Sequence, residues 1–319
     1  MTRFQSVFTA RLAEYVKLRR RLGLRFQVQE GILRSFDRYA CERRHRGGLT
    51  EELARAFAAE VSETTTTMAG RRYLVVRHFA DFLATFDPRA SRLDPRAVPS
   101  ARNQPPPFIF TLEELDSLLS QASRLSSTRR AWNRAVHAMI GLAASSGLRR
   151  GEVLGLDQSD VDLHSGTLLV RQSKFHKDRL APVHSSTLEV LRTYAAVRTA
   201  IPDARAEPAF FVTSGGRRFQ GLQIERVFRQ LVSSVDLHAP QGKRPTFRSL
   251  RHTFAVQRLV AWYRAGANVQ ALLPSLATYM GHVHYTSTSY YLTATAELLG
   301  VAAERLAITA HEASDAKNN

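Results

Sequence analysis

The sequence predicts a mainly α-helical protein with two domains and one small β-sheet, which lies in the second domain. Three observations support this fold class. The chain of 319 residues has room for about two domains of ordinary size. Apolar residues recur at helical spacing along most of the chain, and they alternate every second residue only between about 161 and 183. Six of the 12 prolines fall within residues 88–107, where they would interrupt a helix or strand.

Residues 1–90 are predicted to form a small helical domain. Thr50 precedes two glutamates, which is typical of the start of a helix. The expected helices span 4–22, 28–44, the segment that follows Thr50, and 65–86. The side chains expected to face the core in the last of them are Val76, Phe79, Leu83 and Phe86, which recur at helical spacing.

The proline-rich segment 91–109 is predicted to be an extended linker, because proline lacks a backbone donor and restricts the residue before it. The second domain, residues 110–310, begins with a capping box in which Thr111 is followed by Glu114. The tail 311–319 has no apolar pattern and is expected to be disordered.

The second domain is predicted to contain both helices and strands. Its expected elements are a buried helix over 131–144, a short helix over 151–156, strands Val161–Val170 and Leu180–Val183, and helices from about 221 onward, interrupted by a basic loop at 242–245.

The charge of the chain favours a polyanionic partner. Lysine and arginine total 45 against 28 acidic residues, which gives a formal net charge of +17. Both predicted domains share this excess, as a protein that contacts nucleic acid with both would require. A basic solvated surface, or association with ribosomes, is the alternative. The candidate phosphate-binding residues are Arg19, Arg20 and Arg21 near the end of the first helix, and Lys243 and Arg244 in the basic loop.

Cysteine and hydropathy patterns narrow the class further. Cys41 is the only cysteine, which excludes an intrachain disulfide and a cysteine-rich zinc site. The pair His282 and His284 could suggest a metal, but no acid or cysteine pattern accompanies it, so no metal is expected. The chain has no run of 18 apolar residues and no signal peptide, which predicts a cytoplasmic, nucleoid-associated protein without a membrane partner.

Four motifs in the second predicted domain contain candidate catalytic residues. They contain Arg149 within 146–156, Lys174 in the predicted hairpin turn, Arg251 within 250–255, and the pair formed by His282 and Tyr291, nine residues apart. Two guanidiniums, an imidazole and a phenol suit the task of holding a phosphodiester while a tyrosine oxygen attacks its phosphorus. These motifs, in this order, resemble those of the tyrosine recombinases, also called the phage integrase family. The resemblance covers roughly residues 110–300.

The resemblance implies a mechanism and a role for each residue. Tyr291 would attack the scissile phosphorus and form a 3′-phosphotyrosyl bond, and Arg149 and Arg251 would stabilise the charge on the non-bridging oxygens. His282 would donate a hydrogen bond to the same phosphate or assist the proton of Tyr291. Lys174 would protonate the leaving 5′-oxygen. No metal, ATP or other cofactor would be required.

Some positions need separate comment. The family usually has histidine three residues before the second arginine, where this chain has Arg248, which can donate hydrogen bonds but cannot shuttle protons. Glu152 is interpreted as an orienting or structural carboxylate, and His252 as a packing or supporting histidine. Tyr290 is a rival nucleophile, and the spacing from the histidine favours Tyr291.

The resemblance also implies an assembly. The expected protein is a C-shaped clamp of a helical core-binding domain and a catalytic domain around double-stranded DNA, acting as a tetramer on two paired sites, with or without accessory recombinase proteins. The segment 273–282 suggests an integrase or transposase of a mobile element. A helix after Tyr291, containing Leu298, Leu299, Val301 and Leu306, would dock on a neighbouring protomer or on its own domain. A type IB topoisomerase and a non-catalytic DNA-binding factor descended from a recombinase are the alternatives.

Overall fold

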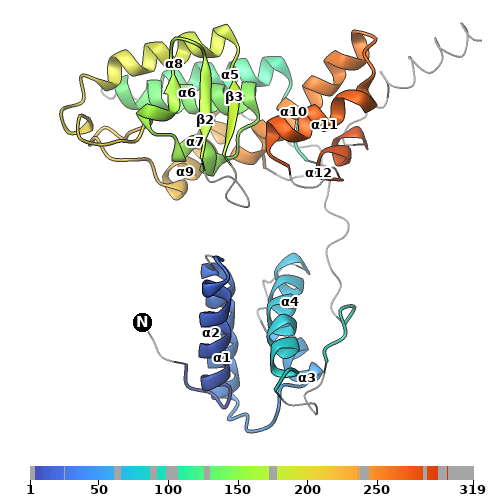
Figure 1. The fold of residues 1–319 in the computed structure, drawn as a ribbon. Coiled ribbons are helices and arrows are strands. Elements are labelled where there is room, and N and C mark those ends of the chain that lie inside the picture. The colour runs from blue at the N-terminus through green and yellow to red at the C-terminus, as the bar shows by residue number, and fades with distance from the viewer. Residues whose placement is uncertain are drawn as a thin grey trace, which may run out of the picture. The chain divides into compact units, whose positions relative to one another are not determined.

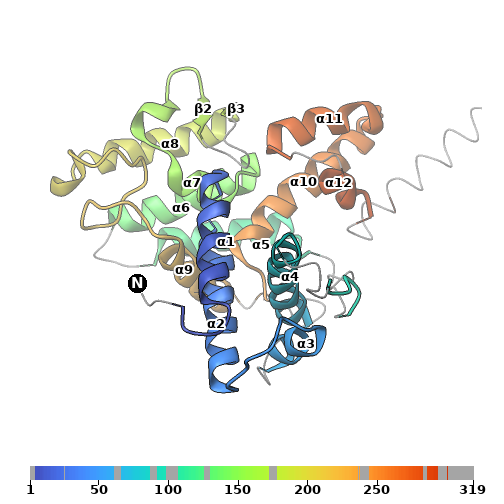
Figure 2. The same ribbon diagram turned by 60° about the horizontal axis from the view of Figure 1, so that its bottom comes forward.

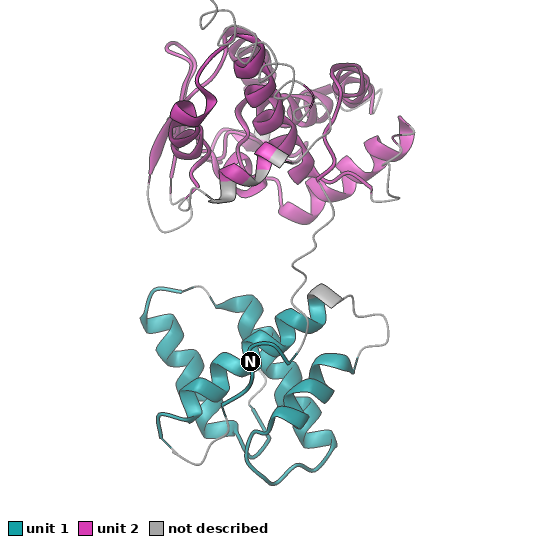
Figure 3. Ribbon diagram, turned by 90° about the vertical axis from the view of Figure 1, so that its right-hand side faces the viewer, with its two compact units in different colours: residues 1–105 teal, residues 106–319 magenta. Residues whose placement is uncertain are grey.

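The chain forms two compact units, residues 1–105 (unit 1) and residues 106–319 (unit 2), each of which is described by itself (Figure 3). The computed structural model describes residues 4–24, 26–60, 66–86, 92–97, 107–125, 130–171, 178–235, 237, 244–282, 286–293 and 300. Within these ranges most residues are helical, and the strands form one small sheet in unit 2, so the predicted fold class is confirmed. The predicted features that lie outside the described residues are Lys174, Lys243, His284, the tail 311–319, and the side chains of Leu298, Leu299, Val301 and Leu306.

The described part of unit 1 is a bundle of helices around an aromatic core. Its helices are α1 (Thr9–Arg21), α2 (Gln27–Glu42), α3 (Glu51–Ala59) and α4 (Thr66–Leu83) (Figures 1 and 2). The hydroxyl of Thr50 accepts a hydrogen bond from the backbone N–H of Leu53, so the predicted N-cap of α3 is confirmed. The core includes Phe8, Phe36, Phe57 and Phe79.

Two predictions in unit 1 need correction. The first helix begins at Thr9 rather than at residue 4, because the backbone N–H of Ser6 and the N–H of Gln5 both donate to the carboxylate of Asp37. Phe86 does not face the core: α4 ends before it, and its side chain is 53% exposed. The guanidinium of Arg11 lies 4.2 Å from the centre of the Phe86 ring and covers it in part.

Unit 2 contains the larger set of elements. Its α-helices are α5 (Leu112–Ser123), α6 (Arg130–Ser146), α7 (Arg150–Gly155), α8 (Ser185–Arg198), α9 (Gly221–Ser234), α10 (Phe247–Arg264), α11 (Val269–Met280) and α12 (Thr286–Ser289). Its strands are β1 (Val161–Asp162), β2 (Thr167–Val170) and β3 (Arg179–Pro182). Its 3₁₀ segments are η1 (Gln158–Asp160), η2 (Pro202–Ala204) and η3 (Tyr290–Thr293).

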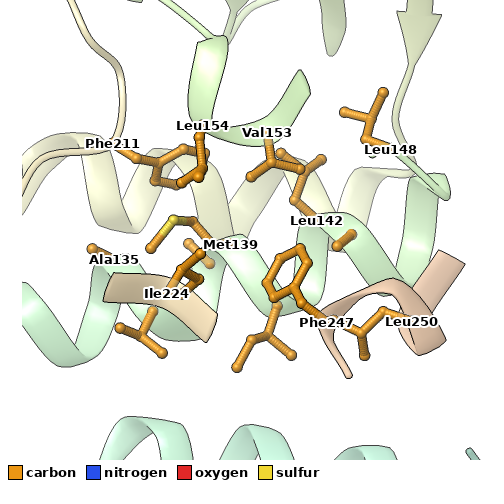
Figure 4. Packing of buried hydrophobic residues seen from close by; sticks show 14 of the residues in the cluster. Ala135, Met139, Leu142, Leu148, Val153, Leu154, Phe211, Ile224, Phe247 and Leu250 are labelled. Carbon is orange, nitrogen blue, oxygen red and sulfur yellow. The ribbon is translucent and has the colours of Figure 1, made fainter. Parts of the chain in front are cut away.

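Helix α6 is the centre of the unit 2 core. It packs against α5, α8 and α10, and its Met139 and Leu142 are fully buried. Figure 4 shows these two side chains among Val153 of α7 and Phe247 and Leu250 of α10. Because α6 is held on several sides, its C-terminal end, from which the Arg149 segment departs, has a fixed position.

The first helix of unit 2, α5, begins at the predicted capping box. Thr111 caps α5 by accepting a hydrogen bond from the N–H of Glu114, and the Glu114 carboxylate accepts one from the N–H of Thr111, so the capping box is confirmed. Just before it, the N–H of Phe110 donates to the hydroxyl of Thr253 in α10. This bond ties the start of the unit to the helix that carries Arg251.

The sheet differs from the prediction in one respect. The expected strand from 161 to 170 is interrupted, and β1 and β2 form an antiparallel hairpin with Val161 paired to Leu168. Asp162 causes the turn, because its carboxylate accepts hydrogen bonds from the N–H groups of His164 and Ser165. Strand β3 adds antiparallel to β2, with Leu168 opposite Ala181, which gives the order β1-β2-β3.

Helices α10, α11 and α12 gather on one side of unit 2 (Figures 1 and 2). None of the described helices is both long enough and apolar enough to cross a membrane.

Candidate active site

The structure brings Arg149, Arg251, His282 and Tyr291 together in unit 2. Arg149 immediately precedes α7, Arg251 lies in α10, His282 follows α11, and Tyr291 lies in η3. A guanidinium nitrogen of Arg251 is 2.7 Å from Nε2 of His282, and the Tyr291 hydroxyl is 2.9 Å from Nδ1 of the neighbouring residue, His252.

The C-terminal end of α11 gathers the arginines of the site. Its last carbonyls have no partner within the helix and carry the negative end of the helix dipole. Three consecutive carbonyls each accept a hydrogen bond from a different arginine: Tyr279 from Arg179 at 2.9 Å, Met280 from Arg251 at 2.9 Å, and Gly281 from Arg149 at 2.7 Å.

Gly281 is required for this gathering for two reasons. It ends α11 in the left-handed conformation, with φ of +67°, which a residue with a side chain rarely adopts. A Cβ atom at this position would also lie 2.8 Å from Nη1 of Arg179. Glycine at this position therefore leaves room for Arg179 at the end of this helix.

A buried carboxylate, Glu152, joins two of these arginines. Its oxygens accept hydrogen bonds from Arg149 at 2.6 Å and from Arg179 at 2.9 and 3.1 Å, and from the backbone N–H of Arg149. Burial acts to raise the pKa of Glu152, but the hydrogen bond from Arg179 and the other interactions with both arginines outweigh it, so the pKa is lowered. The carboxylate is thus ionised at neutral pH and holds the guanidinium and the backbone N–H of Arg149.

Arg251 is buried, with 5% of its surface exposed. Besides Met280, it donates to the carbonyl of Gly147 at 2.6 Å. Gly147 has φ of +63°, and a Cβ atom there would lie 2.4 Å from the ring of Phe254, so the turn after α6 also depends on glycine. Burial, followed by the charge of Arg149, lowers the pKa of Arg251 to about 10, and the guanidinium keeps its charge at neutral pH.

The partners of His282 fix its tautomer. Arginine can only donate, so Nε2 of His282 accepts from Arg251, and Nδ1 carries the proton. Nδ1 then donates to the hydroxyl of Thr288, a fully buried residue of α12, at 2.7 Å. Burial, and then the charges of Arg251, Arg149 and Arg179, lower the pKa of His282 to about 4, so the ring is neutral.

Replacing Thr288 with valine is expected to destabilise unit 2 by about 1 kcal/mol, because the partly buried N–H of His282 loses its acceptor while the volume is conserved. The ¹⁵N shifts of His282 should also show a mixture of tautomers. Denaturant unfolding followed by tryptophan fluorescence measures the first effect, since both tryptophans, Trp132 and Trp262, lie in unit 2. An unchanged stability together with an unchanged tautomer would contradict this role of Thr288.

Tyr291 is held by packing as well as by its hydroxyl. Only 3% of its surface is exposed, and its ring belongs to a small core with Phe254, Leu259 and Leu276. The ring of His252 lies beside it, with centroids 5.5 Å apart.

Arg248, which stands where the resemblance led us to expect histidine, is exposed. It lies one turn before His252 on α10, and its charge contributes to lowering the pKa of that histidine. The structure therefore places His252, four residues after Arg248, in contact with Tyr291.

The predicted DNA-binding residues have different surroundings. Arg20 and Arg21 line a groove of about 900 Å³ beside α1, where Arg20 also pairs with Glu30. The guanidinium of Arg19 lies over the ring of Tyr15. Arg244 is exposed shortly before α10 begins.

Two residues of this site were not predicted from the sequence, Arg179 and Thr288. Arg179 was visible only as part of the charged run at the end of the hairpin turn, and Thr288 lies in a stretch of small hydroxyl residues. Neither pattern reveals the partner that each meets in the fold. Among the described residues, no group of three or more His, Cys, Asp or Glu side chains is placed to hold a metal ion.

Comparison with known proteins gives one family. Residues 109–297 match the family model described as the phage integrase family. A protein of Sinorhizobium fredii named as an integrase/recombinase, y4rE, is 41% identical over 305 residues, which cover 96% of this chain and 97% of that protein. Tyrosine recombinase XerD of Ralstonia nicotianae is 29% identical over 242 residues, covering 75% and 73%.

Solved structures share the fold. The XerH site-specific recombinase bound to its palindromic difH substrate has a TM-score of 0.66 at 15% identity, over 86% of this chain and 78% of that one. The Tn1549 transposon integrase in complex with transposon right end DNA has a TM-score of 0.65 at 16% identity, over 95% and 100%.

Proposed function

The chain belongs to the phage integrase family of tyrosine recombinases, and from this membership and the geometry of its site we propose that it cuts and rejoins double-stranded DNA through a covalent bond to Tyr291. The observation that carries the assignment of residues is the gathering of Arg149 and Arg251 on adjacent carbonyls of α11, next to His282 and Tyr291.

The arginines bind the scissile phosphate in this proposal. Both are already oriented by backbone carbonyls and, for Arg149, by Glu152, so little reorganisation is needed when the phosphate arrives. Negative charge grows on the non-bridging oxygens as Tyr291 attacks, and each well-placed donor contributes about 3–4 kcal/mol to the transition state. His282 donates to the same phosphate, which requires its Nε2 to gain a proton while Thr288 changes from acceptor to donor.

The remaining steps involve Lys174, which lies outside the described residues, and Arg248, which is described. Lys174 protonates the 5′-oxygen as it leaves. The phosphotyrosyl bond conserves the energy of the broken bond, and attack by a 5′-hydroxyl of another strand rejoins the DNA without ATP or a metal. Arg248 adds positive charge near the phosphate.

Both units bind DNA in this proposal, closing around it as a C-shaped clamp. The cations of the groove beside α1, together with Arg244 in unit 2, supply phosphate contacts, so affinity falls steeply with salt. The active form is a tetramer on two paired sites, with the segment after Tyr291 docking on a neighbouring protomer, and accessory recombinases can take part. We assign the enzyme to a mobile element and to the nucleoid. The names of the relatives, all integrases or recombinases among those described, favour this function over a topoisomerase or a non-catalytic factor.

The test is to trap the covalent intermediate. Duplexes that bind the protein are selected from a random-sequence library, nicked near the cleavage position so that the cut strand diffuses away, and incubated with the intact protein. A band on a denaturing gel, whose protease digest carries nucleotide on Tyr291, is the expected result. Specific binding to the selected duplex without any adduct would overturn the proposal and indicate a DNA-binding module. An adduct on Tyr290 would overturn the assignment of the nucleophile.

A further inference from the structure

The hydrogen bond between Tyr291 and His252 has no role in the mechanism described so far. Nδ1 of His252 lies 2.9 Å from the Tyr291 hydroxyl, and the two rings are in contact. His252 is part of α10, directly after Arg251, so the residue that holds the phosphate and the residue that contacts the nucleophile share one turn of helix.

Attack by Tyr291 requires that the phenol lose its proton, and the other described groups near it are poorly suited to accept one. Arg251, whose charge acts on Tyr291, keeps its proton at neutral pH, because its pKa is about 10. Both ring nitrogens of His282 are occupied, one by the guanidinium of Arg251 and one by the hydroxyl of Thr288. Glu152 is paired with Arg149 and Arg179.

We propose that His252 is the catalytic base for Tyr291, accepting the phenolic proton on Nδ1 during cleavage and returning it during rejoining. The proposal rests on the proposed function and adds to it the group that activates the nucleophile. It requires the neutral tautomer with the proton on Nε2, so that Nδ1 presents its lone pair to the hydroxyl.

The step balances without a co-reactant. In cleavage, the O–H bond of Tyr291 breaks, its proton goes to Nδ1 of His252, and the oxygen forms a bond to phosphorus. The bond from phosphorus to the 5′-oxygen breaks, and that oxygen takes a proton from the general acid. In rejoining, a 5′-hydroxyl attacks and returns its proton to the general acid as its oxygen bonds to phosphorus. The bond from phosphorus to Tyr291 breaks, and the phenolate recovers its proton from the His252 imidazolium.

Because of the charges around His252, its pKa, and so its strength as a base, depends on whether the substrate phosphate is bound. Burial, and then the cations Arg248 and Arg251, lower its pKa to about 4, so the ring is neutral before DNA binds. The other titratable group that contacts it is Tyr291 on η3, and the opposite neighbour of the Tyr291 ring is His282 after α11. A phosphodiester held by Arg251 offsets the positive charge there, which raises the pKa of His252 and strengthens the base only when a phosphate is in place.

The experiment measures single-turnover cleavage by the intact protein on the selected nicked duplex with a bridging sulfur in place of the scissile 5′-oxygen. Sulfur leaves without needing a proton, so the rate reports activation of Tyr291 and no longer depends on the general acid. In His252→Gln the rate should fall by about 100-fold or more. From pH 7 to 9 it should then rise about tenfold per unit as hydroxide replaces the base, while the wild-type rate stays nearly constant.

Controls separate this proposal from the proposed function and from misfolding. Formation of the wild-type adduct tests the function itself, and His137→Gln, which changes a half-buried histidine of α6, should cleave as the wild type does. Imidazole should partly restore cleavage in His252→Ala, which only a folded protein can show. Two results would overturn the assignment. One is a near-normal cleavage rate of His252→Gln on the sulfur substrate. The other is a loss of rate that neither decreases at higher pH nor is rescued by imidazole.

Discussion

Replacing Tyr291 with phenylalanine is expected to abolish the covalent protein–DNA adduct while leaving DNA affinity within about twofold of the wild type. The variant lacks the oxygen that attacks phosphorus, and no other group at that position can form the phosphotyrosyl bond. Arg149 and Arg251, which are proposed to bind the phosphate, are held by Glu152 and by the end of α11, so their positions do not depend on the hydroxyl.

The fold should survive this change, because the ring rather than the hydroxyl supplies most of the packing. The side chain is 3% exposed within an apolar cluster, and phenylalanine fills the same space. The lost hydrogen bond to His252 should reduce the free energy of unfolding by only about 1 kcal/mol. Adduct formation is scored on denaturing gels and affinity by mobility shift at fixed salt.

A matched control exists in the adjacent residue. Tyr290→Phe should retain adduct formation, since the nine-residue spacing from His282 and the contact with His252 both single out Tyr291. If Tyr291→Phe still forms the adduct and Tyr290→Phe does not, the nucleophile is misassigned. If Tyr291→Phe loses DNA binding in parallel with the adduct, the hydroxyl has a structural role that the contacts do not show.

The residues proposed to carry the chemistry could be selected from the sequence because each lies in a local motif. The turn at Gly147 before Arg149, and the glycine before His282, mark places where the chain must adopt a left-handed conformation, and glycine signals this directly. The capping boxes and helical periodicity likewise depend on neighbours within four residues, which is why most helices were correctly placed.

The interactions that orient these residues were not predictable, because they join distant parts of the chain. Arg179 meets Glu152 from a strand 27 residues later, and Arg149 meets the carbonyl of Gly281 across 132 residues. Thr288 is only six residues from His282, but its stretch of small hydroxyl residues does not indicate this contact. His252 appeared to be a supporting residue, since nothing in the helical pattern of α10 indicates which side chain faces η3. The misplacement of Phe86 has a related cause, because periodicity continues past the end of α4 and does not show where the helix stops.

Replacing Glu152 with glutamine is expected to lower the free energy of unfolding of unit 2 by about 3 kcal/mol near pH 7. The carboxylate is the counter-ion of Arg149 and Arg179 in a site where its own side chain is only 7% exposed. The neutral amide leaves both guanidiniums, and the nearby Arg251, without that negative charge. The orientation of Arg149 is lost as well, so cleavage should slow in the same variant.

The pH dependence of this stability loss shows whether Glu152 stabilises the arginines through its charge or only through its packing. Because the pKa of Glu152 is lowered by folding, its stabilising contribution is complete above the unfolded value of about 4.3 and is lost as pH falls through the lower folded value. The difference between wild type and Glu152→Gln should therefore be largest at pH 6–8 and shrink below about pH 4. Tryptophan fluorescence during urea unfolding measures it for unit 2 alone, since Trp132 and Trp262 both lie there.

An exposed ion pair in the same unit supplies the comparison. Glu189 and Arg192 are 2.6 Å apart on α8, but 66% and 43% of their side chains are exposed, so Glu189→Gln should cost about 0.5 kcal/mol or less. Similar losses in the two variants would mean that the pairing of Glu152 with the arginines adds little to stability. A loss in Glu152→Gln that persists unchanged to pH 3 would show that shape, and not charge, holds Arg149 and Arg179 together. We expect Glu152→Gln to lose more unfolding free energy than Glu189→Gln, and only in the pH range in which Glu152 is ionised. This result requires that one buried carboxylate keeps several guanidiniums together at the end of α11 before any phosphate is bound.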